Sequence, residues 1–158
     1  MVTRMRFDEL DRQIVHVLQG DGRASFAELA RELGASEATI RARVARLLRS
    51  GAVKVVASVD ALELGFTVAY IGVRVRGGAL DRVLKAMRAT PEVTYVVVCA
   101  GSFDLFVEVV CTDGPALMRL LDERIRQAPG VEYAETFTVL DIAKDEYQWP
   151  ESGVSIPA

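Results

Sequence analysis

The stretch SFAELARELGASEATIRARVARLLRSG, residues 25–51, decides the fold of this chain because it predicts two helices joined by a tight turn. Ser25 followed by Glu28 has the spacing of a capping box, which favours the start of a helix. Gly34 can end the first helix, since glycine adopts the left-handed conformation that a helix end needs. Ser36 can then begin the second helix. A short helix, a glycine-containing turn and a longer helix predict a helix-turn-helix.

The second of these helices has one apolar face and one basic face. Its buried stripe is predicted by four residues at helical spacing, namely Ile40, Val44, Leu47 and Leu48. The opposite face carries four arginines and one acid, and on it we expect six DNA-binding residues: Ser36, Glu37, Thr39, Arg41, Arg43 and Arg46. The planar fork of arginine suits phosphate oxygens and guanine edges, and a helix start attracts phosphate. The pattern therefore favours DNA binding, and an ordinary solvated basic helix is the alternative.

Charge is distributed unevenly along the 158 residues. Residues 1–60 hold ten Lys and Arg against eight Asp and Glu, a net of +2, whereas residues 61–158 hold nine against fourteen, a net of −5. The whole chain carries −3, so only its first part is suited to contact phosphate. With 51% hydrophobic residues the chain can bury a core, and its length fits one domain or two small ones.

The sequence predicts no metal, no cofactor and no membrane partner. Cys99 and Cys111 lie in apolar runs without a CxxC pair, which is typical of buried free thiols in a reducing compartment. His16 is the single histidine, so no set of zinc ligands can be assembled. No apolar run approaches the roughly 18 residues of a membrane span, and the N-terminus lacks the apolar region of a signal peptide. We expect a cytoplasmic protein.

The segments around the helix-turn-helix predict a winged domain. Residues 8–20 predict a first helix, capped by Asp8, that completes a three-helix unit. Residues 52–60, AVKVVASVD, are rich in β-branched residues and partly alternating, which predicts a strand that forms the wing, with Lys54 beside the DNA-binding helix. Residues 61–66 then predict a hinge.

From Thr67 the pattern changes to strand, helix, strand, strand, helix, strand. The segments RATPEVTY (88–95) and RQAPGVEY (126–133) share four residue types, and each ends a helix and begins a strand. This internal similarity fits the two related halves of a ferredoxin-like βαββαβ fold. The fold class is therefore α+β, with four parts: a winged helix-turn-helix DNA-binding domain at 1–60, a hinge at 61–66, a ferredoxin-like effector-binding and dimerisation domain at 67–147, and a flexible tail at 148–158.

The predicted sheet is apolar on both faces. In this topology both helices cover one face, so a monomer would have a polar second face. In the strand at 103–111, however, Phe106 and Val110 face away from the apolar set around Val107, with Glu108 as the one charge among them. Such a face is either an interface or an aggregation hazard. We expect a homodimer formed sheet to sheet, which would also bring two DNA-binding helices to one duplex.

The order of these parts, including the hinge LELGF, resembles the Lrp/AsnC (feast/famine) transcriptional regulators over residues 7–145. LDRQIVHVLQGDGRASFAELARELGAS (10–36) and RVARLLRSGAVK (43–54) resemble the DNA-binding part of that family. GSFD at 101–104 resembles its effector turn, and APGV at 128–131 resembles its last helix-to-strand junction.

The resemblance implies a dimer that binds double-stranded DNA and often assembles further into an octamer. It also implies a small-molecule effector, commonly an amino acid, bound at the interface between dimers. Transferred to this chain, the resemblance places five residues at or near DNA: Ser36, Glu37, Thr39, Arg41 and Arg43. It assigns effector binding to Gly101, Ser102, Phe103, Asp104, Thr136 and Thr138. Ser102 stands where many members carry an acid, and Glu37 and Ala38 replace a proline-containing helix start.

The chemistry of the GSFD turn fits an amino acid in two ways. A glycine turn offers backbone N–H groups to a carboxylate, and Asp104 can pair with an ammonium group. The alternative for Asp104 is a turn-capping role.

Three functions remain open from the sequence. The first is a DNA-binding regulator in which an effector shifts the balance between assemblies. The second is an enzyme, since some tetrapyrrole decarboxylases resemble this family in fold, but the second domain has no histidine to act as acid or base. The third is a ligand-sensing oligomer without DNA binding, which the four arginines disfavour. We therefore expect the regulator.

Overall fold

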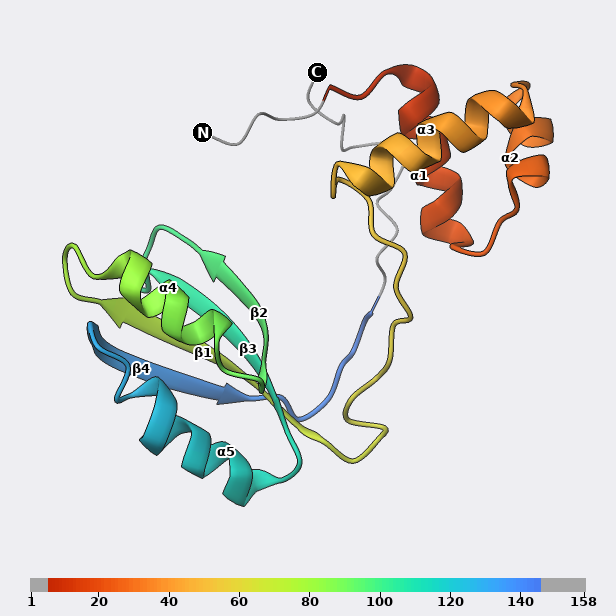
Figure 1. Ribbon diagram of the computed structural model, residues 1–158. Coiled ribbons are helices and arrows are strands. Elements are labelled where there is room, and N and C mark those ends of the chain that lie inside the picture. Colours follow the sequence, from red (N-terminus) through yellow and green to blue (C-terminus); the bar gives the residue numbers. More distant parts are fainter. Residues whose placement is uncertain (1–5, 146–158) are drawn as a thin grey trace. The chain divides into compact units, whose positions relative to one another are not determined.

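The computed structural model describes residues 6–145, which form two compact units (Figure 1). Among these residues, the first unit, here called the helical head, comprises 6–58 together with 144 and 145, and the second, here called the sheet unit, spans Val59–Ala143. The tail expected at 148–158 lies outside the described residues. No helix within residues 6–145 is long and apolar enough to cross a membrane.

The helical head consists of α1 (Glu9–Gly20), α2 (Phe26–Leu33) and α3 (Glu37–Arg49). The predicted caps are confirmed. The Ser25 hydroxyl accepts from the Glu28 N–H in a capping box, and Ser36 accepts from the Thr39 N–H. These side chains satisfy N–H groups that a helix start leaves without a partner.

One small core holds the three helices together. Gly34 ends α2 with φ 64°, as the sequence predicted. The core consists of Ile14, Leu29, Ile40, Val44 and Leu47. Leu48, which was predicted to belong to the buried stripe of α3, is instead 42% exposed.

The predicted wing is wrong: residues 52–60 form no strand. The Val53 N–H donates to the Leu47 oxygen at 3.4 Å, and the residues that follow, up to Asp60, join no sheet. Val55, Val56 and Val59 are exposed. β-Branched residues favour a strand only where a neighbouring strand can pair with it, and none of the described residues pairs with this segment.

The segment expected as a hinge is a short hydrogen-bonded turn. The Asp60 carboxylate accepts from the N–H groups of Leu62 and Glu63, and the Phe66 N–H donates to the Ala61 oxygen at 2.9 Å. Gly65 has φ 84°, which the turn requires and which a side chain would make unfavourable.

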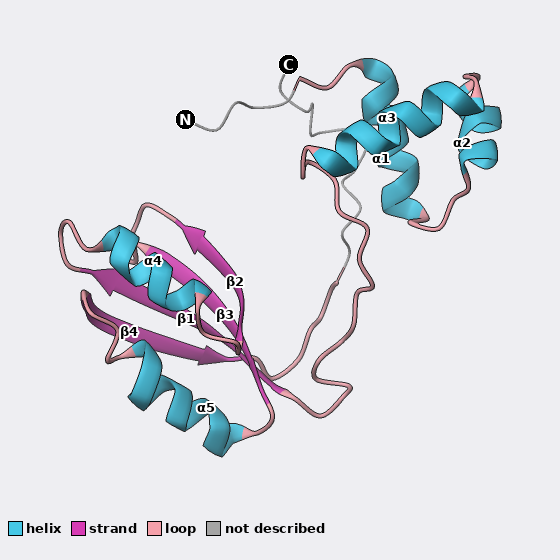
Figure 2. Cartoon of the chain, in the orientation of Figure 1, coloured by secondary structure: helices cyan, strands magenta, loops and turns pink. Residues whose placement is uncertain are grey.

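The sheet unit has the predicted βαββαβ order. Its elements are β1 (Thr67–Val75), α4 (Leu80–Arg88), β2 (Val93–Val98), β3 (Leu105–Cys111), α5 (Gly114–Leu120), a π-helical continuation η1 (Leu121–Ile125) and β4 (Val131–Thr138). The strands pair antiparallel in the order β2-β3-β1-β4. Both helices cover one face of the sheet (Figure 2). The ferredoxin-like fold is therefore confirmed.

The two faces of the sheet differ in burial. Ile71, Val73 and Val107 point into the core beneath the helices and are fully buried. The other face carries large apolar side chains that stay partly exposed in the chain, among them Tyr70, Phe106, Tyr133 and Phe137. This second set is here called the open face.

Candidate functional site

The start of α3 presents two coupled hydroxyl groups to solvent. The Ser36 Oγ accepts from the Thr39 N–H at 3.1 Å and shares a hydrogen bond with the Thr39 Oγ1 at 2.8 Å. Both residues are exposed. The start of α3, which carries the positive end of the helix dipole, therefore lies at the surface, where a phosphate can approach it.

Arg41 lies on the surface of the head beside two partners. Its Nη2 donates to the Glu37 Oε1 at 2.6 Å, and its guanidinium carbon lies 4.6 Å from the centre of the Phe26 ring. An exposed i,i+4 ion pair contributes well under about 1 kcal/mol, so a phosphate can displace the glutamate at little cost.

Arg43 and Arg46 are bound to carboxylates of α1 that the sequence analysis did not single out for this role. Arg43 pairs with Asp8, and its Nη1 also donates to the Asp11 Oδ1 at 3.1 Å. Arg46 pairs with the other oxygen of Asp11. Both carboxylates were visible in the sequence, but the spacing along α1 showed only a helix start. The partners on α3 are 32 and 35 residues away.

The ion pairs shift the titration of the carboxylates. The hydrogen bond from Arg43 is the main cause that lowers the pKa of Asp8. Burial raises the pKa of Asp11, but hydrogen bonds from Arg46, from the Asp8 backbone and from Arg43 outweigh it, and the pKa is lowered overall. Both groups are therefore ionised at neutral pH.

The GSFD turn is fastened to β1 through Asp104. Its Oδ2 accepts from the Val75 N–H at 2.7 Å, and its own N–H donates to the Val73 oxygen at 2.9 Å. The Cys99 thiol donates to the Phe103 oxygen at 3.2 Å. The Asp104 carboxylate thus ties the turn to β1, 29 residues away, rather than capping the turn itself, and this contact occupies one of its two oxygens.

Phe103 leaves this turn and lies on the open face. A Cβ atom added at Gly72 would be 2.7 Å from its ring, so glycine is needed there. The ring also packs within 5.5 Å of Phe106, 6.4 Å of Tyr133 and 6.5 Å of Phe137, measured between centroids. Nothing in the sequence indicated this contact between Phe103 and Gly72.

The two threonines of β4 lie apart from Phe103. Thr136 pairs with Ile71 in the register, so its side chain is on the helix-covered face, whereas Phe103 is on the open face. The Thr136 Oγ1 is buried and has no hydrogen-bond partner. Thr138 is two pairs further along, opposite Ala69. A single chain therefore does not gather the six expected effector residues into one pocket.

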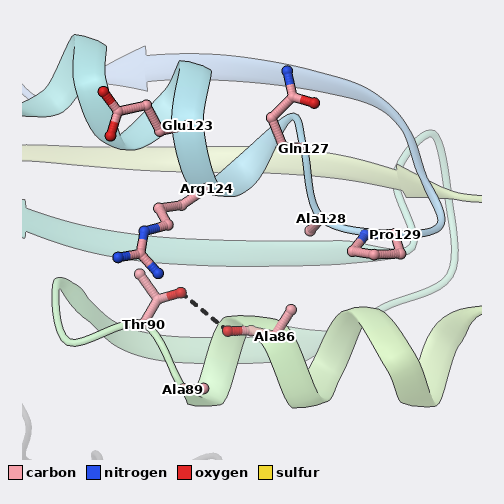
Figure 3. A pocket seen from close by; sticks show the side chains of 8 residues that line it. All are labelled: Ala86, Ala89, Thr90, Glu123, Arg124, Gln127, Ala128 and Pro129. Atoms are coloured by element: carbon pink, nitrogen blue, oxygen red, sulfur yellow. Dashed lines mark hydrogen bonds between the residues drawn. The ribbon is translucent and has the colours of Figure 1, made fainter.

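A groove of about 270 Å³ lies between α4 and the segment after α5 (Figure 3). Its lining comprises Ala86, Ala89, Thr90, Glu123, Arg124, Gln127, Ala128 and Pro129. Arg124 points toward Thr90, whose hydroxyl donates to the Ala86 oxygen at 3.0 Å. None of the predicted site residues lines this groove. Within residues 6–145 no cluster of His, Cys, Asp and Glu is suited to hold a metal ion.

Both units match known domains. The AsnC-type helix-turn-helix domain matches residues 7–48, and the Lrp/AsnC ligand binding domain matches residues 68–149. The HTH-type transcriptional regulator FL11 of Pyrococcus horikoshii is 33% identical over 149 residues, covering 93% of this chain and 98% of the relative. The regulatory protein AsnC of Escherichia coli is 30% identical over 136 residues, covering 84% of this chain and 90% of the relative.

Solved structures agree with these matches. The structure of E. coli AsnC has a TM-score of 0.74 at 29% identity and covers 89% of this chain and 97% of its own. The complex of the transcriptional regulator NMB0573 of Neisseria meningitidis with L-Met has a TM-score of 0.78 at 25% identity, covering 92% and 97%. Because both units match the two domains of one family, and the relatives align over nearly their whole length, this chain belongs to the Lrp/AsnC family of transcriptional regulators.

Proposed function

We propose that the chain regulates transcription by placing α3 on double-stranded DNA, in response to an amino acid bound by the sheet unit. The observation that carries the DNA part is the open, hydroxyl-capped start of α3 with a row of arginines behind it. The contacts expected from the sequence stay a proposal: Ser36, Glu37, Thr39, Arg41, Arg43 and Arg46. The domain limits 1–60 and 67–147, with the hinge between them, belong to the same proposal.

Fluorescence anisotropy with labelled genomic fragments tests DNA binding. The logarithm of the affinity should fall linearly with the logarithm of the salt concentration, because phosphate contacts release counterions. Arg41→Ala should weaken DNA binding and reduce the steepness of this salt dependence by about 1. Arg119→Ala, a change on α5 in the sheet unit, is the matched control and should leave both unchanged. An affinity independent of salt would contradict the proposal.

The proposed effector is an amino acid bound by Gly101, Ser102, Phe103 and Asp104 together with Thr136 and Thr138 of β4. The solved relative in complex with L-Met supports this class of ligand. The second oxygen of Asp104 can accept from an ammonium group, and the Thr136 hydroxyl has no hydrogen-bond partner within residues 6–145. Because one chain keeps Phe103 and Thr136 on opposite faces, the complete site needs a second chain.

A thermal-shift screen against amino acids, L-methionine included, tests the effector. A ligand that binds only the native state raises the unfolding midpoint. Thr136→Val keeps the shape of the side chain and removes a hydroxyl that makes no hydrogen bond in the chain, so the fold should persist while the ligand shift is reduced. Thr94→Val on β2 is the control. No shift with any amino acid would remove this part of the proposal.

We also infer a homodimer that buries the open face, and an octamer built from such dimers. Four large exposed apolar side chains on one sheet face support the dimer. Phe106→Glu should give monomers in light scattering, whereas Met118→Glu, which changes an equally apolar and 57% exposed residue on α5, should not. If Phe106→Glu stays dimeric, the interface lies elsewhere.

We infer regulation in the cytoplasm rather than catalysis, because the named relatives are transcriptional regulators. An absorbance change on adding a tetrapyrrole would favour the enzyme instead.

A further inference from the structure

Asp11 is the one charged residue that is buried in the described part of the chain. Its exposed fraction is 0%, and a carboxylate in such a place is costly unless it is paired and hydrogen-bonded. It lies in the first turn of α1 and completes a capping box with Asp8, a role that the exposed Glu28 fills equally well in α2. Its burial therefore serves something other than capping.

Both oxygens of Asp11 are fully used. The Oδ1 accepts from the Arg43 Nη1 at 3.1 Å, and the Oδ2 accepts from Arg46 and from the Asp8 N–H, the latter at 3.1 Å. The Asp11 N–H donates in turn to the Asp8 Oδ1 at 3.0 Å. One carboxylate thus connects the start of α1 to two successive turns of α3.

With respect to the described residues, the two arginines keep donors free. A guanidinium group has five N–H donors, and the ion pairs occupy only the Nη1 of Arg43 and the Nη2 of Arg46. The side chains remain 30% and 43% exposed. Arg43 and Arg46 are three residues apart and therefore neighbours on one side of α3.

From this geometry we propose that Asp11 is a positioning residue for DNA binding: it holds Arg43 and Arg46 in fixed orientations so that their remaining donors meet neighbouring phosphates. The inference rests on the proposed DNA binding. An arginine that is already ordered loses less side-chain entropy when it binds, and its rigid fork keeps the free donors aimed.

A different role for the same contacts predicts the opposite result. Asp8 and Asp11 together carry two negative charges, and Arg43 and Arg46 carry two positive charges. If the carboxylates merely neutralise the arginines, removing one of them should free positive charge and tighten DNA binding. If Asp11 positions the arginines, removing its charge should weaken binding despite the gain in net positive charge.

The test is Asp11→Asn in the full chain, with DNA affinity measured by anisotropy across a salt series well below the unfolding midpoint. We expect affinity to fall about tenfold and the salt slope to decrease by up to about 2 for each head, one for each misplaced arginine. Glu9→Gln is the matched control, since it removes an exposed carboxylate from the same turn of α1, which pairs with Arg12 at 3.6 Å rather than with an arginine of α3, and it should not weaken binding. If Asp11→Asn bound DNA more tightly, or if its affinity depended on salt as steeply as that of the unaltered chain, the proposal would be overturned.

A second variant tests the proposal if Asp11→Asn fails to fold. Arg46→Lys keeps a positive charge that can pair with Asp11, but it lacks the fork that reaches a phosphate at the same time. It should fold and lose about 1 unit of salt slope, and an unchanged slope would overturn the proposal. If the unaltered chain bound no DNA, the proposed function itself would fail, which is a different result from binding that these variants leave intact.

Discussion

The helical head and the sheet unit differ in how far one chain satisfies its own functional side chains. In the head, three arginines of α3, namely Arg41, Arg43 and Arg46, already have partners, either on the same helix or at the start of α1. In the sheet unit, the open face lacks a cover and the Thr136 hydroxyl lacks a hydrogen bond. Within the described residues, three arginines of α3 are therefore paired inside one chain, whereas the open face and the Thr136 hydroxyl are the places where the proposed second chain and effector would act.

The largest expected effect tests whether the head folds independently of the sheet unit. Leu29→Ala removes a fully buried side chain from a core of five residues and should destabilise the head by about 2–5 kcal/mol. Amide hydrogen exchange should then increase in α1, α2 and α3 and stay unchanged in β1 and β3. Val107→Ala is the reciprocal control in the sheet unit. Increased exchange in both units after Leu29→Ala would show that they unfold together.

A second prediction concerns the close contact on the open face. Gly72→Ala places a methyl group 2.7 Å from the Phe103 ring and should cost about 1–3 kcal/mol, because the ring must move. Gly77→Ala meets nothing within 4 Å and is the control. The unfolding midpoint checks the cost. If Gly72→Ala were neutral, the ring would not lie over this position.

These contacts show how far the sequence could predict the molecule. The helix starts at Asp8, Ser25 and Ser36 were predictable, since a cap acts on N–H groups two or three residues away. The wing and the ion pairs of Asp11 were not, because each depends on what lies opposite in space. A periodic pattern indicates which side of a helix or strand a residue occupies, but not whether a neighbour 30 residues away is present.

In the candidate site, too, local spacing was predictable from the sequence and contacts between distant residues were not. The basic face of α3 followed from helical spacing alone, and the structure places Arg41 beside α2 and Arg43 and Arg46 beside the start of α1. The effector residues came from the resemblance, and their distribution over two faces of the sheet depends on register: Thr136 opposes Ile71. The role of Gly72 required knowledge of where the Phe103 ring lies, which no local pattern contains.

A third prediction uses the lowered pKa values in the head. Asp8 and Asp11 both titrate below their ordinary value of 3.8, so their ionised forms stabilise the folded state above that pH. This stability is lost as the pH falls from about 4 through the lowered values. The melting midpoint of the head should therefore drop over this range, and in Asp11→Asn the drop should be shallower. An equally steep drop in the variant would assign the acid sensitivity to other carboxylates.

The smallest expected effect concerns the exposed pair of Arg41 and Glu37. Glu37→Gln removes its charge, and an exposed i,i+4 pair contributes only about 0.3–0.5 kcal/mol, so the unfolding midpoint should hardly change. Asp11→Asn removes one charge as well, but from a buried site with two arginine partners, and it should lower the midpoint clearly. The two variants have the same change in formal charge and differ in burial, so the difference between their midpoints measures what burial adds to an ion pair in this head. Equal midpoints would mean that Asp11 is solvated in solution and that α1 holds α3 through apolar contacts alone.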